Sequence, residues 1–292
     1  MKVLVLGGGG MLASDLVAVL SETHDCYGAT INEVDITDLN SINAGLDRYR
    51  PEVVVNCAAY TQVDKAETDR ETALLVNGIG VQNLGLACNA RQMPLCHIST
   101  DYVFDGLKDS PYTPFDCPKP VNFYGESKLA GEKYLQWAAK RFYIIRTSWL
   151  YGHHGPNFVK TILRLASNSS ELRVVDDQRG SPTWTVSLSY GIKAVIESGK
   201  PGIYHITDET DGTLTWYGFA SEIVRQAGLN SRVIPISTSE YPTPAKRPRY
   251  SVLDMSSTCL STGFKPVKWQ EALERYVVKF PSKSLALTTE QR

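Results

Sequence analysis

Residues 2–13 read KVLVLGGGGMLA, and the fold follows from this stretch. The apolar run Lys2–Leu6 is typical of a strand buried on both faces of a parallel sheet. Four glycines follow, and the next residues, SDLVAVLSE, have helical spacing. Gly7, Gly10 and Ala13 form a G-x-x-G-x-x-A pattern, which lets backbone N–H groups approach a pyrophosphate with no Cβ in the way. The stretch predicts a dinucleotide-binding unit, with a plain glycine-rich turn as the alternative.

Apolar runs recur through the first half of the chain, each followed by a helical pattern. We expect further strands within 26–31, 52–59, 95–99 and 142–148, with helices after the Asp38 cap, over 72–92 and over 124–141. This alternation predicts an α/β fold with a doubly wound parallel sheet, that is, a Rossmann fold.

The composition of the chain changes after Trp149, where glycine, proline and aromatic residues become more frequent. Helical patterns return near 185, 215 and 269, and the polar end, 281–292, is expected to fray. We therefore expect a dinucleotide-binding domain over 1–150 and a smaller, mainly substrate-binding domain over 151–292. The helix at 185–199 is a candidate for returning to the first domain.

Composition excludes several classes of protein. The 292 residues carry a net charge of -1, so nothing points to nucleic acid or an anionic membrane as a partner. No apolar run is long enough for a membrane span or a signal peptide, and the six cysteines form no C-x-x-C pair. A reducing, cytoplasmic setting is therefore expected. The pair His153-His154 has no third ligand at a suitable spacing, so we predict a loop there and no metal site.

Tyr124 and Lys128 are the pair that says most about chemistry. They lie four residues apart in a predicted helix and therefore share a face. A tyrosine has a pKa near 10, and a neighbouring cation lowers it. We expect the Lys128 ammonium to bring the pKa of the Tyr124 phenol toward neutrality. Alone, Y-x-x-x-K also occurs on solvated helix faces, so its meaning depends on the surrounding residues.

The end of the second predicted strand indicates no cofactor preference. An acidic residue there usually selects NAD and a nearby arginine NADP, but residues 29–32 are neutral. Both NADH and NADPH are therefore expected to work. Asp35 and Ile36 lie where an adenine edge could be read, or in a solvated turn. Ala58 and Ala59 end the third strand and leave room for a flat ligand or for tight helix packing.

Three polar positions come next along the chain. Asn77 lies in an apolar helix and must be hydrogen-bonded, either to support the site or to satisfy a core. His97 is expected to be a packed core histidine. Thr100 and Asp101 follow its strand at the edge where open α/β sheets bind ligands.

Eight motifs lie along the chain: the glycine loop, NCAA (56–59), VDKAE (63–67), STDYVFDG (99–106), YGESKLAGE (124–132), RTSW (146–149), DQRGSPT (177–183) and RPRYSVLD (247–254). Together they resemble one family, the dTDP-4-dehydrorhamnose reductases among the extended short-chain dehydrogenase/reductases. The resemblance covers nearly the whole chain. Cys57 and Tyr60 depart from it, because many members have alanine and histidine there.

The resemblance implies reduction of the 4-keto group of dTDP-4-dehydro-L-rhamnose by NADPH or NADH, giving a precursor of surface polysaccharide. It implies that Tyr124 donates a proton, that Lys128 tunes the phenol and holds the nicotinamide ribose, and that Thr100 hydrogen-bonds the reacting oxygen. Thr100, Asp101 and Trp149 would contact the nucleotide sugar. A homodimer and a structural Mg²⁺ are left open. The cofactor would contact Gly7, Gly10, Met11, Leu12, Asp35, Ile36, Ala58, Ala59, Thr61, Tyr124 and Lys128.

Three alternatives stay open. Dehydratases and epimerases of nucleotide sugars share the fold, but the dehydratases typically follow Thr-Asp with glutamate, whereas Tyr102 follows here. A non-catalytic regulatory relative would have lost part of the catalytic set, whereas Thr100, Tyr124 and Lys128 are all present. A reductase of another nucleotide sugar is not distinguished by these motifs.

Overall fold

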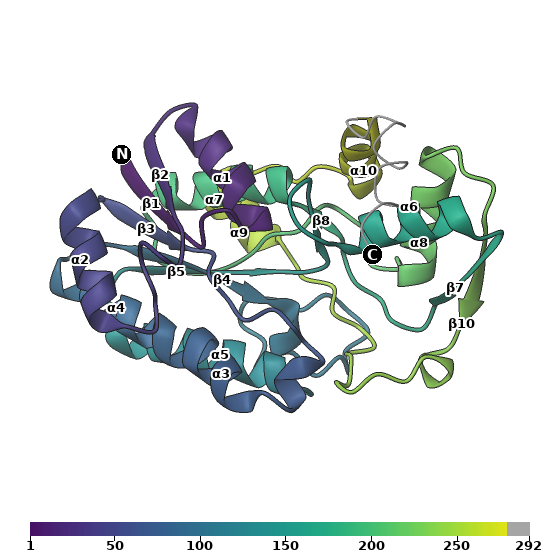
Figure 1. Cartoon of the computed structure of the whole chain (residues 1–292), viewed down its shortest axis with the longest axis horizontal. Coiled ribbons are helices and arrows are strands. Elements are labelled where there is room, and N and C mark those ends of the chain that lie inside the picture. The colour runs from purple at the N-terminus through teal and green to yellow at the C-terminus, as the bar shows by residue number, and fades with distance from the viewer. Residues whose placement is uncertain (279–292) are drawn as a thin grey trace.

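A six-stranded parallel sheet forms the centre of the computed structural model, which describes residues 1–278 (Figure 1). Its strand order is β2-β1-β3-β4-β5-β9, and each neighbouring pair is parallel. The predicted doubly wound α/β fold is confirmed. The strands are β1 (Lys2–Leu6), β2 (Asp25–Ala29), β3 (Val53–Asn56), β4 (Leu95–Thr100), β5 (Phe142–Thr147) and β9 (Gly202–His205).

Helices cover both faces of this sheet, as Figure 1 shows. On one face lie α1 (Met11–Ser21), α7 (Thr185–Ser198) and α9 (Ser256–Thr262). On the other lie α2 (Leu39–Tyr49), α3 (Arg70–Leu74), α4 (Gly80–Ala90) and α5 (Phe123–Ala138). In β1, Val3 and Val5 pack into the core beneath α1 and α7, and Leu4 and Leu6 pack into the core beneath α2, α4 and α5. Two buried faces explain why this strand is apolar without alternation.

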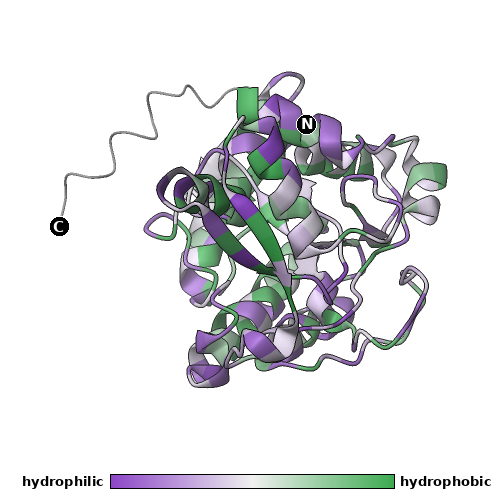
Figure 2. Cartoon of the chain, turned by 90° about the vertical axis from the view of Figure 1, so that its right-hand side faces the viewer, coloured by the Kyte–Doolittle hydropathy of each residue, from purple (hydrophilic) through white to green (hydrophobic). Residues whose placement is uncertain are grey.

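A third core lies beyond the sheet and holds most of the chain after Trp149. It contains α6 (Phe158–Asn168), α8 (Trp216–Gln226) and α10 (Trp269–Val278). The strands β7 (Glu171–Val175) and β10 (Arg232–Ile236) form a parallel pair, as do β6 (Leu150–Tyr151) and β8 (Thr183–Trp184). In Figure 2, where this side faces the viewer, hydrophilic and hydrophobic residues mix along the elements, as expected for elements with one buried face.

The chain passes between these cores more than once. Leu188, Ile192 and Val195 of α7 pack in the same core as α1. β9, which the sequence did not predict, joins the central sheet beside β5. The division into domains at residue 150 stays a prediction, and the expected frayed end, 281–292, lies outside the described residues.

The helix expected over 72–92 is interrupted. Leu75–Ile79 form a π-helical turn between α3 and α4. Asn77 occupies this turn, where its amide reaches the backbone of Tyr60. Such turns are frequent at functional sites. The expected Asp38 cap is confirmed, because its carboxylate accepts from the Asn40 N–H.

All six cysteines are free thiols. Within residues 1–278, no helix combines the length and apolar character needed to cross a bilayer.

Candidate active site

The carboxyl end of β4 carries the two polar residues predicted there. Thr100 ends the strand, and its hydroxyl donates to Asp101 Oδ1 at 2.9 Å. Both side chains are buried, and burial raises the pKa of Asp101 to about 6, although Ser251 and Thr100 lower it through hydrogen bonds. This site therefore holds a carboxyl group that titrates near neutral pH.

Tyr124 and Lys128 lie on the face of α5 that packs against this end of β4. Asn122 caps the helix by accepting from the Gly125 N–H at 2.8 Å. The Tyr124 phenol is hydrogen-bonded to Thr100, and one turn later Lys128 Nζ donates to the Ile98 carbonyl at 2.6 Å. The structure therefore brings Thr100, Tyr124 and Lys128 together, as the sequence predicted.

The expected effect of Lys128 on the phenol is wrong for this structure. Burial, together with the Asp101 carboxylate, raises the pKa of Tyr124 to about 12, and only its hydrogen bond with Thr100 lowers it. Burial likewise lowers the pKa of Lys128 to about 8. Lys128 does not offset this desolvation, because its Nζ donates to the Ile98 carbonyl rather than to the phenol.

The glycine loop lies beside this cluster. Gly7 has φ +82°, and a Cβ on it would lie 2.8 Å from the Ala58 nitrogen, so only glycine fits between β1 and the end of β3. The Gly10 N–H donates to the Gly7 carbonyl at 3.0 Å, and Gly10 caps α1 without any side-chain hydrogen bond. The first N–H groups of α1 are therefore open to an anion, which fits a pyrophosphate. Cys57, next to Ala58, lies near Lys128: burial raises the pKa of its thiol to about 12, although the positive charge of Lys128 lowers it.

The remaining predicted cofactor residues differ in their surroundings. Leu12 and Ile36 are core side chains, so only their backbone could meet a ligand. Asp35 accepts from the Thr37 N–H at 2.8 Å and so closes a turn. Met11 and Ala59 are half-buried and Thr61 is exposed. Their roles as cofactor contacts stay predictions.

Glu33, which the sequence reading passed over, follows β2 at the place where ribose selectivity is usually set. It accepts from Tyr27 and Tyr49 hydroxyls at 2.6 and 3.0 Å and from the Thr30 N–H at 2.9 Å. These bonds lower the pKa of Glu33 to about 2. The carboxylate is thus hydrogen-bonded within the protein's own turn and is not free to bind a ribose hydroxyl.

Trp149 lies in an unusual backbone conformation after β5, with φ +44°. Its ring stacks on Trp216 with centroids 3.6 Å apart. On the other side, a Cβ on Gly180 would lie 2.5 Å from the indole, which explains the glycine in the DQRGSPT motif. Strained backbone of this kind is often found at ligand sites.

Several positioning residues were missed or undervalued. Asn77 bonds the Tyr60 backbone and donates to Ser127 of α5 at 3.0 Å, so it ties the loop after β3 to the Tyr124 helix. Arg247 from the late RPRYSVLD motif pairs with Asp64 through two hydrogen bonds of 2.5 and 2.9 Å. From the sequence, Asn77 was expected either to support the site or to satisfy a core, and the partner of Arg247 could not be inferred.

A buried ion pair fixes α5 to the sheet. Arg146 of β5 donates to both oxygens of Glu132, at 3.0 and 2.7 Å, and Ser99 donates to the same carboxylate at 2.5 Å. Arg146 and Glu132 are only 2% and 1% exposed, so each depends on the other for its charge.

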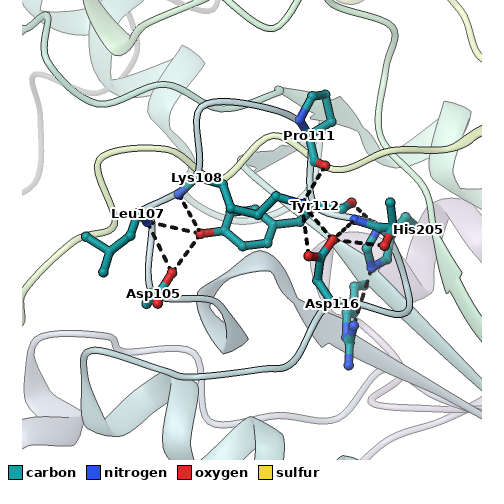
Figure 3. Close-up of polar contacts among 9 residues, drawn as sticks. Asp105, Leu107, Lys108, Pro111, Tyr112, Asp116 and His205 are labelled. Carbon is teal, nitrogen blue, oxygen red and sulfur yellow. Dashed lines mark hydrogen bonds and ion pairs between the residues drawn. The ribbon is translucent and has the colours of Figure 1, made fainter.

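Tyr112 anchors the loop between β4 and α5 (Figure 3). Its hydroxyl donates to Asp105 at 2.8 Å and accepts from the Leu107 N–H at 3.1 Å. Its carbonyl lies 3.0 Å from His205 Nδ1 of β9. The loop that borders the site is therefore tied to the far strand of the sheet.

Over residues 1–278, no group of three or more His, Cys, Asp and Glu side chains could hold a metal ion. The magnesium ion that the resemblance left open therefore receives no support from this part of the chain.

Comparison with known proteins decides the family. The model of the RmlD substrate binding domain family matches residues 1–281. The chain belongs to this family. The resemblance to dTDP-4-dehydrorhamnose reductases is thereby confirmed, and the family assignment makes the protein an oxidoreductase.

Among similar proteins, a dTDP-4-keto-6-deoxy-D-glucose reductase of Streptomyces niveus is 42% identical over 274 residues, covering 92% of this chain and 94% of its own. A dTDP-4-dehydrorhamnose reductase of Aggregatibacter actinomycetemcomitans is 39% identical, covering 94% and 97%. The crystal structure of dTDP-4-dehydrorhamnose reductase from Bacillus anthracis in complex with NADP superposes with a TM-score of 0.91, at 38% identity, covering 96% of this chain and 100% of that one.

Proposed function

We propose that this protein reduces the 4-keto group of dTDP-4-dehydro-L-rhamnose to give dTDP-L-rhamnose, using NADPH or NADH. The observation that carries the proposal is the convergence of Thr100, Tyr124 and Lys128 at the carboxyl end of β4, beside the glycine loop. Open α/β sheets bind ligands at that edge. The named relatives and the NADP complex of the Bacillus anthracis protein support the choice of substrate and cofactor.

A reduced nicotinamide bound at the glycine loop would supply the hydride to C4 of the sugar. Tyr124 donates its phenolic proton to the former carbonyl oxygen, so that the C=O group becomes CH–OH and the phenolate takes a proton from water. A raised pKa suits this direction, because the phenol stays protonated at neutral pH. The Thr100 hydroxyl hydrogen-bonds the same oxygen as negative charge develops on it.

The other residues position the two ligands. Lys128 would hold the nicotinamide ribose, Asp101 would accept from a sugar hydroxyl, and Trp149 would lie against the sugar. The backbone of Gly7, Gly10 and Met11 would take the pyrophosphate.

A dehydratase is disfavoured by the residue after Asp101. Tyr102 would have to act as the base, but burial and the Asp101 carboxylate raise the pKa of its phenol. A phenol of that kind does not abstract protons at neutral pH.

The sugar itself has a second candidate. The Streptomyces niveus relative is named for dTDP-4-keto-6-deoxy-D-glucose, which has the same 4-keto group on a sugar of different configuration. Loss of NAD(P)H absorbance should be followed with both dTDP sugars and with a UDP-4-keto sugar. We expect the L-rhamnose precursor to give the highest kcat/KM. A tenfold higher kcat/KM with another sugar would make that sugar the substrate in place of dTDP-4-dehydro-L-rhamnose.

Tyr124→Phe tests the chemistry. We expect turnover to fall at least a thousandfold, which corresponds to about 4 kcal/mol, while NADPH binding is retained because the ring remains. Tyr102→Phe, on the neighbouring ring, is the control, and it should keep most of the activity. A Tyr124→Phe variant with more than a tenth of the wild-type rate would show that another group donates the proton.

A further inference from the structure

Residues 245–254, between β10 and α9, form a strap that runs from the C-terminal core back to the central sheet (Figure 1). The strap carries the RPRYSVLD motif, for which the proposed function has no role. Part of it is bound to the DQRGSPT motif: the Arg179 N–H donates to the Arg249 carbonyl at 2.8 Å, and the Ser251 N–H donates to the Arg179 carbonyl at 2.8 Å. The strap is therefore attached to the motif that packs against Trp149.

The beginning of the strap is clamped to the loop after β3. Arg247 donates to both carboxylate oxygens of Asp64, at 2.5 and 2.9 Å, and the Ala245 N–H donates to Asp64 Oδ1 at 3.1 Å. The hydrogen bond from Arg247 lowers the pKa of Asp64, so the carboxylate is charged at neutral pH. A bidentate contact between a guanidinium and a carboxylate fixes orientation as well as distance. The strap and the loop are thus held in one relative position.

The clamped part of the strap also reaches the helix that carries Tyr124. The Lys246 carbonyl accepts from Asn122 Nδ2 at 2.8 Å, a contact between residues 124 positions apart in the sequence. Asn122 is the cap of α5, because its Oδ1 accepts from the Gly125 N–H at 2.8 Å, and it is only 4% exposed. Its side-chain amide therefore links the strap to the first turn of α5, in which Tyr124 lies.

The loop after β3 holds the same turn by a second route. Glu67 Oε1 accepts from the Phe123 N–H at 2.9 Å. The first N–H groups of a helix have no partner within it, so the groups that bind them decide where the helix begins. The beginning of α5 decides where the Tyr124 phenol lies relative to Thr100. Misplacing a reacting group by about 1 Å can slow a reaction on the order of a hundredfold.

We propose that Asp64, Arg247 and Asn122 are positioning residues, which set the phenol of Tyr124 by clamping the strap to the first turn of α5. Because the strap is also bound to Arg179, it keeps the phenol in register with the side of the site where Trp149 lies. The effect on catalysis rests on the proposed function, in which Tyr124 donates the proton. The clamp itself rests only on the contacts.

Arg247→Met removes the guanidinium and keeps an aliphatic side chain. At saturating sugar we expect kcat to fall about tenfold or more, while the Kd for NADPH stays within about twofold of wild type. Arg173→Met is the matched control, because it removes an exposed arginine from an ion pair of 2.6 Å with Glu240 and should leave kcat unchanged. A raised KM for the sugar with an unchanged kcat would show that Arg247 binds the substrate, and would overturn the proposal.

Two further variants test the path. Asp64→Asn keeps an acceptor for the Ala245 N–H but loses the charge, and it should lower kcat in the same way, so the test does not depend on one variant folding. Asn122→Ser keeps a good helix cap but is too short to reach the Lys246 carbonyl. We expect the double variant of Asn122→Ser and Arg247→Met to lose no more than the worse single variant. Losses that multiply would show two independent effects and refute the path.

Hydrogen exchange of the protein without ligands, followed by mass spectrometry, reads the first turn of α5 directly. We expect peptides that contain Gly125 and Glu126 to exchange about tenfold faster or more in Arg247→Met and in Asn122→Ser, and unchanged in Arg173→Met. Unchanged exchange in the first two variants would refute the clamp. If exchange rises in both and the wild type reduces no 4-keto sugar, the proposed function fails and the clamp stands.

Discussion

We predict that Asp101→Asn stabilises the fold at neutral pH and lowers the activity of the site. Asp101 is 2% exposed, and its pKa in the folded chain is about 6, against 3.8 for the same group in water. The difference of about two units corresponds to roughly 3 kcal/mol, at about 1.4 kcal/mol a unit. The folded state binds this proton more tightly than the unfolded chain, so stability is greatest below pH 3.8 and falls as the pH rises to about 6. Asparagine cannot ionise, so the variant does not lose stability in this way as the pH rises.

The assay is urea unfolding followed by tryptophan fluorescence, for wild type and variant, at pH 4 and pH 7.5. At each pH, the free energy of unfolding of wild type is subtracted from that of the variant, and the two results are compared. Any effect of the amide that does not depend on pH cancels in this comparison. We expect Asp101→Asn to gain about 2.5 kcal/mol over wild type between pH 4 and pH 7.5, because a small part of the loss has already occurred at pH 4. We also expect kcat/KM to fall at least tenfold, about 1.4 kcal/mol, because the carboxylate would contact the sugar.

Asp105→Asn is the matched control. Its carboxylate accepts from Tyr112 and Leu107, and these bonds lower its pKa in the folded chain. The sign is therefore opposite: Asp105 stabilises the fold above its ordinary pKa, and its loss should cost stability at pH 7.5 and not at low pH. Equal stability differences at both pH values for Asp101→Asn would refute the argument that its burial disfavours the charged form.

Three further predictions follow from the contacts around the site. Glu132→Gln and Arg146→Met should each cost about 3–5 kcal/mol in urea unfolding, and the double variant less than their sum, because each single change strands a buried charge; additive costs would contradict the pairing. Gly180→Ala should raise KM for the sugar at least tenfold and shift tryptophan fluorescence, since its Cβ would lie 2.5 Å from the Trp149 indole; an unchanged KM would remove Trp149 from the sugar site. NADH and NADPH should support turnover within about tenfold of each other, roughly 1.4 kcal/mol, because Glu33 is bound by its own turn; a hundredfold preference would show a discriminating group elsewhere.

Local pattern was enough to predict five of the six strands of the central sheet and the edge of the sheet at which the site was expected. The apolar run before Gly7 and the runs ending at Ala59 and Thr100 are each legible within a few residues, because buried parallel strands leave no polar face. The family motifs likewise named Thr100, Tyr124 and Lys128, and helix spacing placed the last two on one face. β9 was missed because a four-residue edge strand has too little pattern to stand out from a loop.

The protonation of the site depended on contacts between residues far apart in the sequence. Charge spacing alone predicted a phenol made acidic by Lys128, and the fold instead gives it a raised pKa, because burial removes the water that would stabilise the phenolate. Lys128 Nζ lies 3.3 Å from His97 Nε2, and His97 Nδ1 lies 3.2 Å from Asn56 Nδ2, although these pairs are 31 and 41 residues apart in the sequence. The composition and periodicity of the sequence predict which residues can be buried. The protonation state of a buried group depends on the few atoms in contact with it, and those contacts exist only in the folded chain.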